Sequence, residues 1–345
     1  MSAPESSAAS PASLWSLITG YMPARLVHVA AELGIADLLA TGAKTADALA
    51  QEIDAAPVPL RRLLRALASI GLVEELEPGR FALTAAGSQL RSNVPGSMRN
   101  LALMFGGERA WRSWGELLHS VRTGESGTRR VYGAGTFEYL AANPGQAAIF
   151  NAAMAENTRR ITELLVSTYD FSRFRNIVDV GGGDGTLMAS ILAANAGVRG
   201  TVFDLPSGIA QAPRQLSDAG VSERCEIIAG NFFHSVPEAA DAYVLKYVIH
   251  DWDDEQSVAI LSNCCKAMHG ASKILLIERV MPERIEATPI HHRIAMADMN
   301  MLAMPGGQER TEQEYRNLFA AAGLLLERTI PLPGSEISLI EAKRG

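Results

Sequence analysis

Residues 176–186 read Asn-Ile-Val-Asp-Val-Gly-Gly-Gly-Asp-Gly-Thr, and an apolar helical pattern follows at 187–194. This order predicts a buried strand, a glycine-rich turn and a helix. Glycines let the backbone turn tightly and approach a ligand, and the first turn of a helix presents free N–H groups. A dinucleotide fingerprint requires Gly or Ala where Thr186 stands, so the motif argues modestly against NAD. A purely structural turn has the same composition and stays an alternative.

The chain after about residue 170 alternates short β-rich runs with helical segments. Such alternation is typical of an α/β fold built on a parallel sheet. Seven strands complete a small sheet of this kind. We predict them at 176–180, 200–203, 226–229, 242–249 and 273–277, with a final pair near 325–330 and 337–342.

Asp204 ends the second predicted strand, 24 positions after Val180. A carboxylate roughly 20 residues beyond a glycine-rich turn can accept hydrogen bonds from both ribose hydroxyls. The alternative is a solvated helix cap before Pro206. Because the glycine turn and the carboxylate occur together, we favour a nucleoside site, with adenosine lacking a pyrophosphate as the expected ligand.

The region from residue 14 to about 157 has a helical pattern, with apolar residues at three- and four-residue spacing. Within it, helices at 45–53 and 59–70 precede a hairpin at 72–75 and 80–83, which is the order of a winged helix. A DNA-binding role would use Arg61, Arg62 and Arg65 on the second helix. Residues 1–100, however, hold eight Lys or Arg against nine Asp or Glu, so a scaffold or subunit interface is favoured.

Composition narrows the functional class further. The 345 residues are 48% hydrophobic and 20% charged, with a formal net charge of −7 that disfavours nucleic acid and anionic lipid as partners. No apolar run approaches the roughly 18 residues of a membrane span. Three cysteines, at 225, 264 and 265, match no disulfide framework and indicate a reducing cytoplasm. Residues 1–13 lack a secretory pattern and are expected to form a flexible tail.

Four segments together carry a family resemblance: 178–185 (Val-Asp-Val-Gly-Gly-Gly-Asp-Gly), 203–206 (Phe-Asp-Leu-Pro), 246–252 (Lys-Tyr-Val-Ile-His-Asp-Trp) and 306–311 (Gly-Gly-Gln-Glu-Arg-Thr). The chain resembles the S-adenosylmethionine-dependent small-molecule O-methyltransferases of the caffeate, acetylserotonin and hydroxyneurosporene type. The resemblance covers nearly the whole chain. It implies a winged-helix dimerisation domain at 14–100, a helical connector and substrate-pocket segment at 101–170, a Rossmann-like cofactor-binding domain at 171–345, and a homodimer.

The same resemblance implies where S-adenosylmethionine, and its product S-adenosylhomocysteine, would bind. The implied contacts are Gly181 and Gly183 at the methionine end, Asp204 and Leu205 at the ribose, Asn231 and Phe232 at the adenine, and Lys246 beside the nucleoside.

The resemblance makes His250 the general base, with Glu278 and Glu309 on either side of its imidazole. The residues support this independently, because Lys246, Val248 and His250 share one face if the strand runs to 249. Open α/β sheets bind ligands at the carboxyl ends of their strands. The set Gly181, Asp204, Asn231, His250 and Glu278 falls at five such ends.

No metal is expected in this reaction. A sulfonium methyl group is already activated, so positioning and one base suffice. The alternative is a metal held by His250, Asp251, Asp253 and Asp254. Adjacent carboxylates at the start of a helix more often complement its dipole.

The expected acceptor is the hydroxyl of a hydrophobic aromatic compound of bacterial secondary metabolism. Met154, Met301, Met304 and Asp251 are candidate pocket residues, since thioethers pack adaptably on rings. Met304 replaces a polar residue of the plant relatives, which argues against a small phenylpropanoid. N-methylation, a non-methylating hydroxylase and a ligand-sensing DNA regulator remain alternatives.

Overall fold

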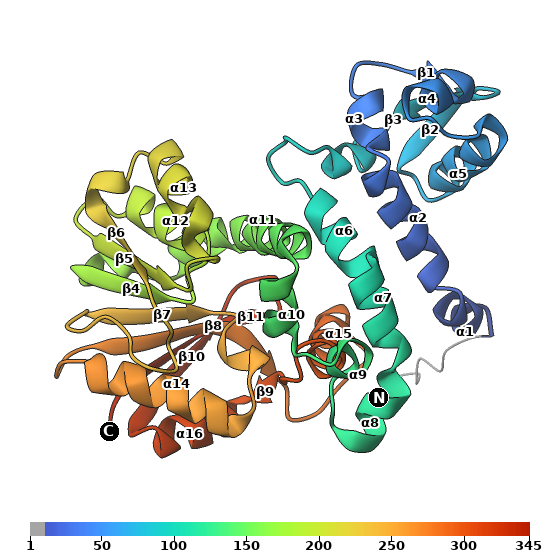
Figure 1. The fold of residues 1–345 in the computed structure, drawn as a ribbon. Coiled ribbons are helices and arrows are strands. Elements are labelled where there is room, and N and C mark those ends of the chain that lie inside the picture. The colour runs from blue at the N-terminus through green and yellow to red at the C-terminus, as the bar shows by residue number, and fades with distance from the viewer. Residues whose placement is uncertain (1–10) are drawn as a thin grey trace, which may run out of the picture. The chain divides into compact units, whose positions relative to one another are not determined.

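The computed structural model describes residues 11–345, and the chain divides into two compact units. The first contains the chain up to Trp111 together with Ala152–Glu156, and the second contains Arg112–Asn151 and Asn157–Gly345. Each unit is coloured along the chain in Figure 1. The division at 111 differs from the predicted boundary at 100. The sequence predicted a flexible tail at 1–13. Residues 1–10 of this segment lie outside the described residues, and helix α1 begins at Pro11.

The N-terminal unit is mostly helical and contains the expected two helices and hairpin. Its small sheet has the order β1-β3-β2 and packs beside α4 and α5 through the buried Leu49, Leu64 and Phe81. The Thr45 hydroxyl accepts a hydrogen bond from Ala48 N at 3.2 Å and caps α4. The elements are α1 (Pro11–Ile18), α2 (Tyr21–Glu32), α3 (Ile35–Leu39), β1 (Lys44–Thr45), α4 (Ala46–Glu52), α5 (Pro57–Ser69), β2 (Val73–Glu77), β3 (Arg80–Leu83), α6 (Arg99–Gly106) and α7 (Glu108–Gly115), which crosses the division.

Two of the three arginines considered for DNA binding, Arg61 and Arg65, face carboxylates of their own unit. Arg61 Nη2 lies 3.1 Å from Asp47 Oδ1, and Arg65 Nε lies 3.3 Å from Glu75 Oε1. Their charges are therefore partly neutralised within the winged-helix motif. This pairing favours the scaffold interpretation over phosphate contact.

The second unit is built on a sheet of seven strands in the order β10-β11-β8-β7-β4-β5-β6, with the short β9 paired to β8. Strands β4 to β8 run parallel, and β10 and β11 are antiparallel to their neighbours. The strands are β4 (Asn176–Val180), β5 (Arg199–Asp204), β6 (Cys225–Ala229), β7 (Ala242–Lys246), β8 (Lys273–Met281), β9 (Arg310–Thr311), β10 (Leu324–Pro331) and β11 (Ile337–Arg344). The predicted α/β class is confirmed.

One predicted strand is too long. The sequence predicted 242–249, whereas β7 ends at Lys246. Tyr247 adopts a left-handed backbone with φ of 53°, which no strand accommodates, and the 3-10 turn η5 (Ile249–Asp251) follows. The apolar run continued past the strand because Val248 and Ile249 are buried in the turn itself.

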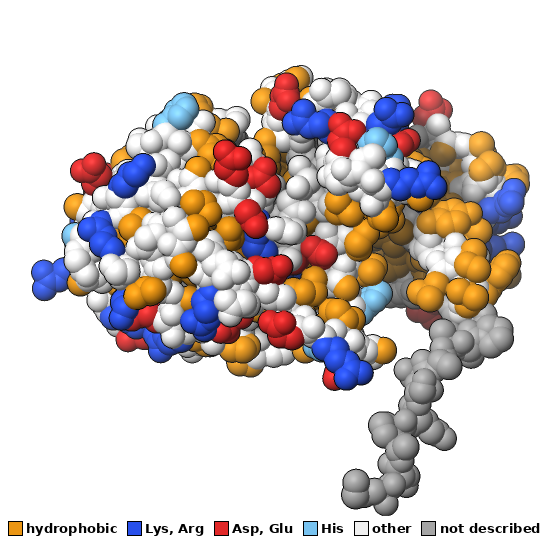
Figure 2. All heavy atoms as spheres, turned by 90° about the horizontal axis from the view of Figure 1, so that it is seen from below, with side chains coloured by type: hydrophobic (Ala, Val, Ile, Leu, Met, Phe, Trp, Pro, Cys, Tyr) orange, Lys and Arg blue, Asp and Glu red, His pale blue; other side chains and the backbone are white. Residues whose placement is uncertain are grey.

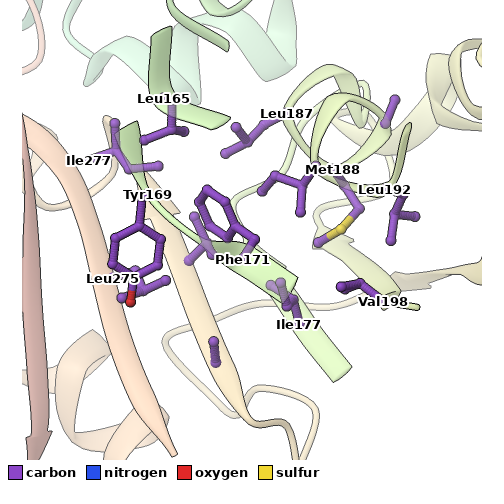
Figure 3. Packing of buried hydrophobic residues seen from close by; sticks show 14 of the residues in the cluster. Leu165, Tyr169, Phe171, Ile177, Leu187, Met188, Leu192, Val198, Leu275 and Ile277 are labelled. Atoms are coloured by element: carbon purple, nitrogen blue, oxygen red, sulfur yellow. The ribbon is translucent and has the colours of Figure 1, made fainter. Parts of the chain in front are cut away.

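Helices cover both faces of this sheet (Figure 1). Leu165, Leu187 and Leu192 pack on one face around Phe171, as Figure 3 shows, and Leu261, Tyr315 and Phe319 pack on the other. None of the described helices is both long and apolar enough to cross a membrane. The helices are α8 (Leu117–Thr123), α9 (Gly127–Tyr132), α10 (Thr136–Ala142), α11 (Pro144–Thr168), α12 (Thr186–Ala194), α13 (Ala212–Asp218), α14 (Asp254–Ala267), α15 (Pro289–Ala303) and α16 (Glu312–Ala321).

Candidate active site

The candidate site lies along the carboxyl ends of five adjacent parallel strands, in the order β6, β5, β4, β7 and β8. Asn231 follows β6, Asp204 ends β5 and Gly181 follows β4. His250 follows β7, and Glu278 lies within β8, which continues to Met281. Parallel strands deliver the chain to one edge of the sheet, so residues far apart in sequence meet there.

The glycine turn after β4 has a backbone that other residues would strain. Gly181, Gly183 and Gly185 have φ of 74°, 55° and 78°. A Cβ atom on Gly181 would lie 2.8 Å from a methyl group of Val248. The turn leads into α12. Its glycines carry no side chains, so a ligand can approach the main chain closely, although the N–H groups of Gly181, Gly183 and Thr186 already bond within the protein.

The Asp204 carboxylate is fixed by main-chain groups. Its Oδ2 accepts a hydrogen bond from Gly183 N at 2.9 Å, and its Oδ1 accepts one from Leu205 N at 2.6 Å. Burial raises the pKa of Asp204, and these two N–H groups offset only part of that rise. The carboxylate is therefore held rigidly against the glycine turn.

Asn231 and Phe232 form the turn after β6. Asn231 Oδ1 accepts a hydrogen bond from Phe233 N at 2.9 Å, so the side chain organises its own loop. The Phe232 ring lies 6.1 Å from Trp252, and Asn263 Nδ2 donates to the Phe232 carbonyl at 2.9 Å. This edge thus presents an aromatic ring beside an amide.

Lys246 and Asp179 are ionisable groups packed below the turns. Burial lowers the pKa of Lys246 to about 8, against the opposing effect of Glu278 and Asp179. Burial raises the pKa of Asp179 to about 7, and Lys246 opposes that shift. The sequence reasoning did not select Asp179, whose Oδ2 is buried without a hydrogen-bond partner.

His250 is 6% exposed and is surrounded by three carboxylates. Its Nδ1 lies 3.1 Å from Glu309 Oε1 and 3.5 Å from Glu278 Oε2. Its Nε2 lies 3.6 Å from Asp251 Oδ1. The two glutamates therefore meet the same ring nitrogen, which differs from the predicted arrangement on either side. With Nδ1–H donated to Glu309, Nε2 is the nitrogen left to accept a proton.

Charge raises the pKa of this imidazole. Burial alone lowers the pKa of His250, but Glu278, Glu309 and Asp251 outweigh it and raise it to about 9. The pKa of Asp251 is raised to about 6 by burial, against the effect of His250. The surrounding carboxylates thus favour the imidazolium form, and the ring can act as a base once Nε2 has lost its proton.

The two glutamates have different environments. Glu278 Oε1 accepts hydrogen bonds from Val248 N and Ile249 N, both at 3.0 Å, and burial raises its pKa to about 7. Glu309 Oε1 also accepts from Arg279 Nη1 at 3.1 Å. Burial raises the pKa of Glu309, but His250 and Arg279 outweigh it and leave it lowered. Glu309 is the more strongly charged partner, and Glu278 also fixes the backbone of η5.

The segment 306–311 clamps the turn that carries His250. A Cβ on Gly307 would lie 1.9 Å from the His250 carbonyl oxygen, so only glycine fits there. Gln308 N donates to that same oxygen at 2.9 Å. β9 pairs in parallel with the end of β8, with Arg310 opposite Val280, and this pairing brings Glu309 beside His250.

Arg310 completes the clamp and was not selected from the sequence. Its side chain is fully buried and donates to the Ile249 carbonyl at 3.1 Å and the Trp252 carbonyl at 2.8 Å. It also donates twice to Asp254 Oδ1, at 3.0 and 2.8 Å. Arg310 lies in the segment 306–311 that carries the family resemblance. Only the structure shows that its side chain binds the carbonyls of Ile249 and Trp252.

Two carboxylates of the acidic run at 251–254 are bound by protein groups. Asp253 Oδ1 caps α14 by accepting from Gln256 N at 2.8 Å, and Asp254 is bound by Arg310. Ligand atoms of His250, Glu278 and Glu309 do lie within 4.8 Å of one another. The Arg279 guanidinium bound to Glu309 opposes a second cation at that point.

The candidate pocket residues divide between the two units. Met301 and Met304 are buried near the end of α15, where Thr136 Oγ1 donates to the Met304 carbonyl at 2.9 Å. Asp251 lies beside His250, as described above. Met154, on α11, belongs to the N-terminal unit. Asn300, which accepts from Trp114 Nε1 at 3.1 Å, had no signal in the sequence.

Comparison with known proteins matches two family models. Residues 114–325 match an O-methyltransferase domain, and residues 15–93 match an O-methyltransferase dimerisation domain. Phenazine O-methyltransferase PhzM of Lysobacter antibioticus is 42% identical over 330 residues, which are 96% of this chain and 95% of that protein.

Two solved structures are also similar. The crystal structure of LaPhzM is 41% identical and covers 97% of this chain and all of its own, with a TM-score of 0.93. NcsB1, an O-methyltransferase from neocarzinostatin biosynthesis, was solved with S-adenosylmethionine and 2-hydroxy-5-methyl naphthoic acid. It is 34% identical, covers 94% of this chain and 96% of its own, and has a TM-score of 0.80.

Proposed function

The chain belongs to the S-adenosylmethionine-dependent O-methyltransferases, and we propose that it methylates a hydroxyl group of a flat aromatic secondary metabolite with His250 as the general base. The observation that carries the base assignment is the occupation of Nδ1 by Glu309 at 3.1 Å, which leaves Nε2 for the acceptor proton. Bound S-adenosylmethionine supplies a methyl group activated by its sulfonium charge.

The residues of the sheet edge suit the cofactor. We assign the ribose hydroxyls to Asp204, whose oxygens keep acceptor capacity beyond the two main-chain bonds, with Leu205 beside it. The open turn at Gly181 and Gly183 admits the methionine end. We assign the adenine to Asn231 and Phe232, and we place Lys246 beside the nucleoside.

The base chemistry follows from the charges around His250. A phenol has a pKa near 10, so an imidazole of pKa about 9 can take its proton with little loss of free energy. Glu309 holds the neutral imidazole in the Nδ1–H tautomer, and Glu309 and Glu278 then stabilise the imidazolium that forms. Because the base must be neutral to accept a proton, turnover should rise with pH toward 9.

The acceptor class is supported by the relatives and by the methionines. The names of the matched proteins cite a phenazine and a naphthoic acid, which are fused aromatic systems. Met301 and Met304 are apolar and adaptable, as a broad ring requires. We expect hydroxyphenazines and hydroxynaphthoates to be better acceptors than caffeate.

Incubation with methyl-labelled S-adenosylmethionine and a panel of such phenols tests this function. Transfer of label to oxygen with formation of S-adenosylhomocysteine supports it. Label found only on amine acceptors would favour N-methylation. An oxygen-dependent product without S-adenosylhomocysteine would favour hydroxylation. Tight, salt-sensitive DNA binding without turnover would favour the regulator.

We also propose a homodimer formed through the dimerisation domain. Helices α1 and α2 expose a run of apolar side chains, and Figure 2 shows apolar side chains gathered on the face of the N-terminal unit that this view presents. The exposed side chains are Leu14, Trp15, Leu17, Ile18, Tyr21 and Met22. Such a patch typically marks a protein interface. Light scattering should give twice the 36.9 kDa chain mass, and a monomer mass would contradict the proposal. The cytoplasmic location stays a prediction.

A further inference from the structure

Tyr247 has a backbone conformation that an aromatic residue rarely adopts. Its φ is 53°, and among the described residues the other non-glycine positions with positive φ are Asp54 and Ala239. A bulky residue in this region is strained, and such strain persists when neighbouring structure holds it. Here Tyr247 N donates to the Ile277 carbonyl at 3.1 Å. A glycine would adopt this turn without strain. The presence of a tyrosine here therefore indicates that its ring has a role of its own.

The ring of Tyr247 lies parallel to the imidazole of His250. Their centroids are 5.1 Å apart and their planes differ by 6°. Two cations also face this ring: Lys246 Nζ at 4.2 Å and the Arg279 guanidinium carbon at 4.7 Å from its centroid. The Tyr247 hydroxyl is buried without a hydrogen-bond partner. The contacts therefore belong to the ring face and not to the hydroxyl.

We propose that Tyr247 is a positioning residue that fixes the plane of the His250 imidazole and stabilises its protonated form. The proposal rests on the proposed role of His250 as general base. Glu309 binds Nδ1 and so fixes one point of the imidazole, but the ring can still tilt about that bond. A parallel aromatic face restricts this freedom and keeps Nε2 on the side of Asp251, 3.6 Å from its Oδ1.

The ring also acts on charge. The face of an aromatic ring carries a partial negative charge and attracts a cation placed over it, and the attraction is larger where water is excluded. Removing the ring deprives the imidazolium of this contact. It also leaves two cations without their shared aromatic partner. Both changes disfavour a proton on the base. The charged or titratable groups that face His250 or the Tyr247 ring are Glu278, Glu309, Asp251, Lys246 and Arg279.

Tyr247→Gly tests the proposal, because glycine accepts the turn while the ring is lost. We expect the plateau value of kcat, reached where the base is neutral, to fall by about tenfold, with the KM for the acceptor and the affinity for S-adenosylmethionine within about twofold. The ascending limb of the pH–rate profile should move to lower pH. Tyr247→Phe, which retains the ring, should keep the kcat and the position of the ascending limb that the unchanged protein shows. Ala239→Gly relieves a left-handed backbone before β7 and serves as the matched control.

A merely structural tyrosine would give a different pattern. The proposal is overturned if Tyr247→Gly matches Tyr247→Phe in the plateau value of kcat and in the position of the ascending limb. Should the glycine variant not fold, Tyr247→Asn takes its place, since asparagine tolerates the same backbone. Equality of the asparagine and phenylalanine variants would overturn the proposal in the same way.

His250→Ala separates this proposal from the proposed function. If His250→Ala retains normal turnover, the general-base assignment is wrong. If His250→Ala loses turnover while Tyr247→Gly behaves like Tyr247→Phe, the base assignment stands and the role of Tyr247 is wrong. In the His250→Ala background, Tyr247→Gly should change the residual rate by less than about twofold, because the group it positions is gone.

Discussion

The two ends of the candidate site are built in different ways. At β4, β5 and β6 the side chains of Asp204 and Asn231 accept hydrogen bonds from main-chain N–H groups, two of which lie one or two residues away, as in the bond from Leu205 N to Asp204. At β7 and β8 the contacts join side chains from distant segments, such as His250 with Glu309. The first end therefore depends on short motifs and the second on tertiary packing. We expect substitutions at the first end to alter cofactor affinity and those at the second to alter turnover.

His250→Ala should give the largest effect and the sharpest contrast between the two ends. Loss of the base should lower kcat by roughly 10²–10⁴-fold, while the affinity for S-adenosylmethionine changes little. Steady-state kinetics and calorimetric titration of the same variant measure the two quantities. A parallel loss of cofactor affinity would show that the two ends are not separable.

Arg310→Met tests whether the bonds from Arg310 stabilise the turn that carries His250. The change removes the shorter bonds to the carbonyls of Ile249 and Trp252, which keep only the longer contacts of Ser257 Oγ and Trp252 N, and it also leaves Asp254 without its arginine. It should lower the free energy of unfolding by about 2–4 kcal/mol. Arg316→Met is the matched control, because that exposed arginine pairs only with Glu312 at 2.6 Å on the same helix. We expect it to cost under about 0.5 kcal/mol. Denaturant unfolding measures both, and equal losses would contradict the clamp.

Glu309→Gln tests the electrostatics of the second end. Glu278 and Glu309 together raise the pKa of His250 to about 9, so the amide at 309 should move the ascending limb of the pH–rate profile down by about one pH unit. The raised pKa has a second consequence. Protonated His250 stabilises the fold fully below its ordinary pKa of 6.5, and this contribution is lost as pH rises through 9. The variant should lose less stability over that pH range. An unmoved limb would exclude Glu309 as a charge partner of His250.

The same contrast explains what the sequence could predict. Strands β4, β5 and β6 were located to within a residue because each is a short β-rich run beside a turn or a helical segment, and Asp204 follows directly from strand spacing. The alternation argument for His250 was wrong in its premise, since β7 ends before it and η5 carries the residue. Arg310 and Tyr247 lie in segments that carry the resemblance, but nothing in those segments indicated what their side chains contact. Their partners lie on other segments, so only tertiary pairing such as that of β8 with β9 identifies them.

Asn231→Asp should have the smallest effect and sharpens the description of the first end. Asn231 Oδ1 already accepts from Phe233 N at 2.9 Å, and aspartate would keep this bond and hence the turn. A carboxylate could also accept from the adenine amino group, and charge-assisted bonds are about twice as strong as neutral ones. We expect S-adenosylmethionine to bind at most about tenfold more tightly. Asp204→Ala, the comparison variant, should weaken binding by more than about tenfold, because both ribose bonds are lost. Calorimetric titration of the two variants ranks the positions. A larger change at 231 than at 204 would mean that the adenosine does not lie across β5 and β6 in the proposed order.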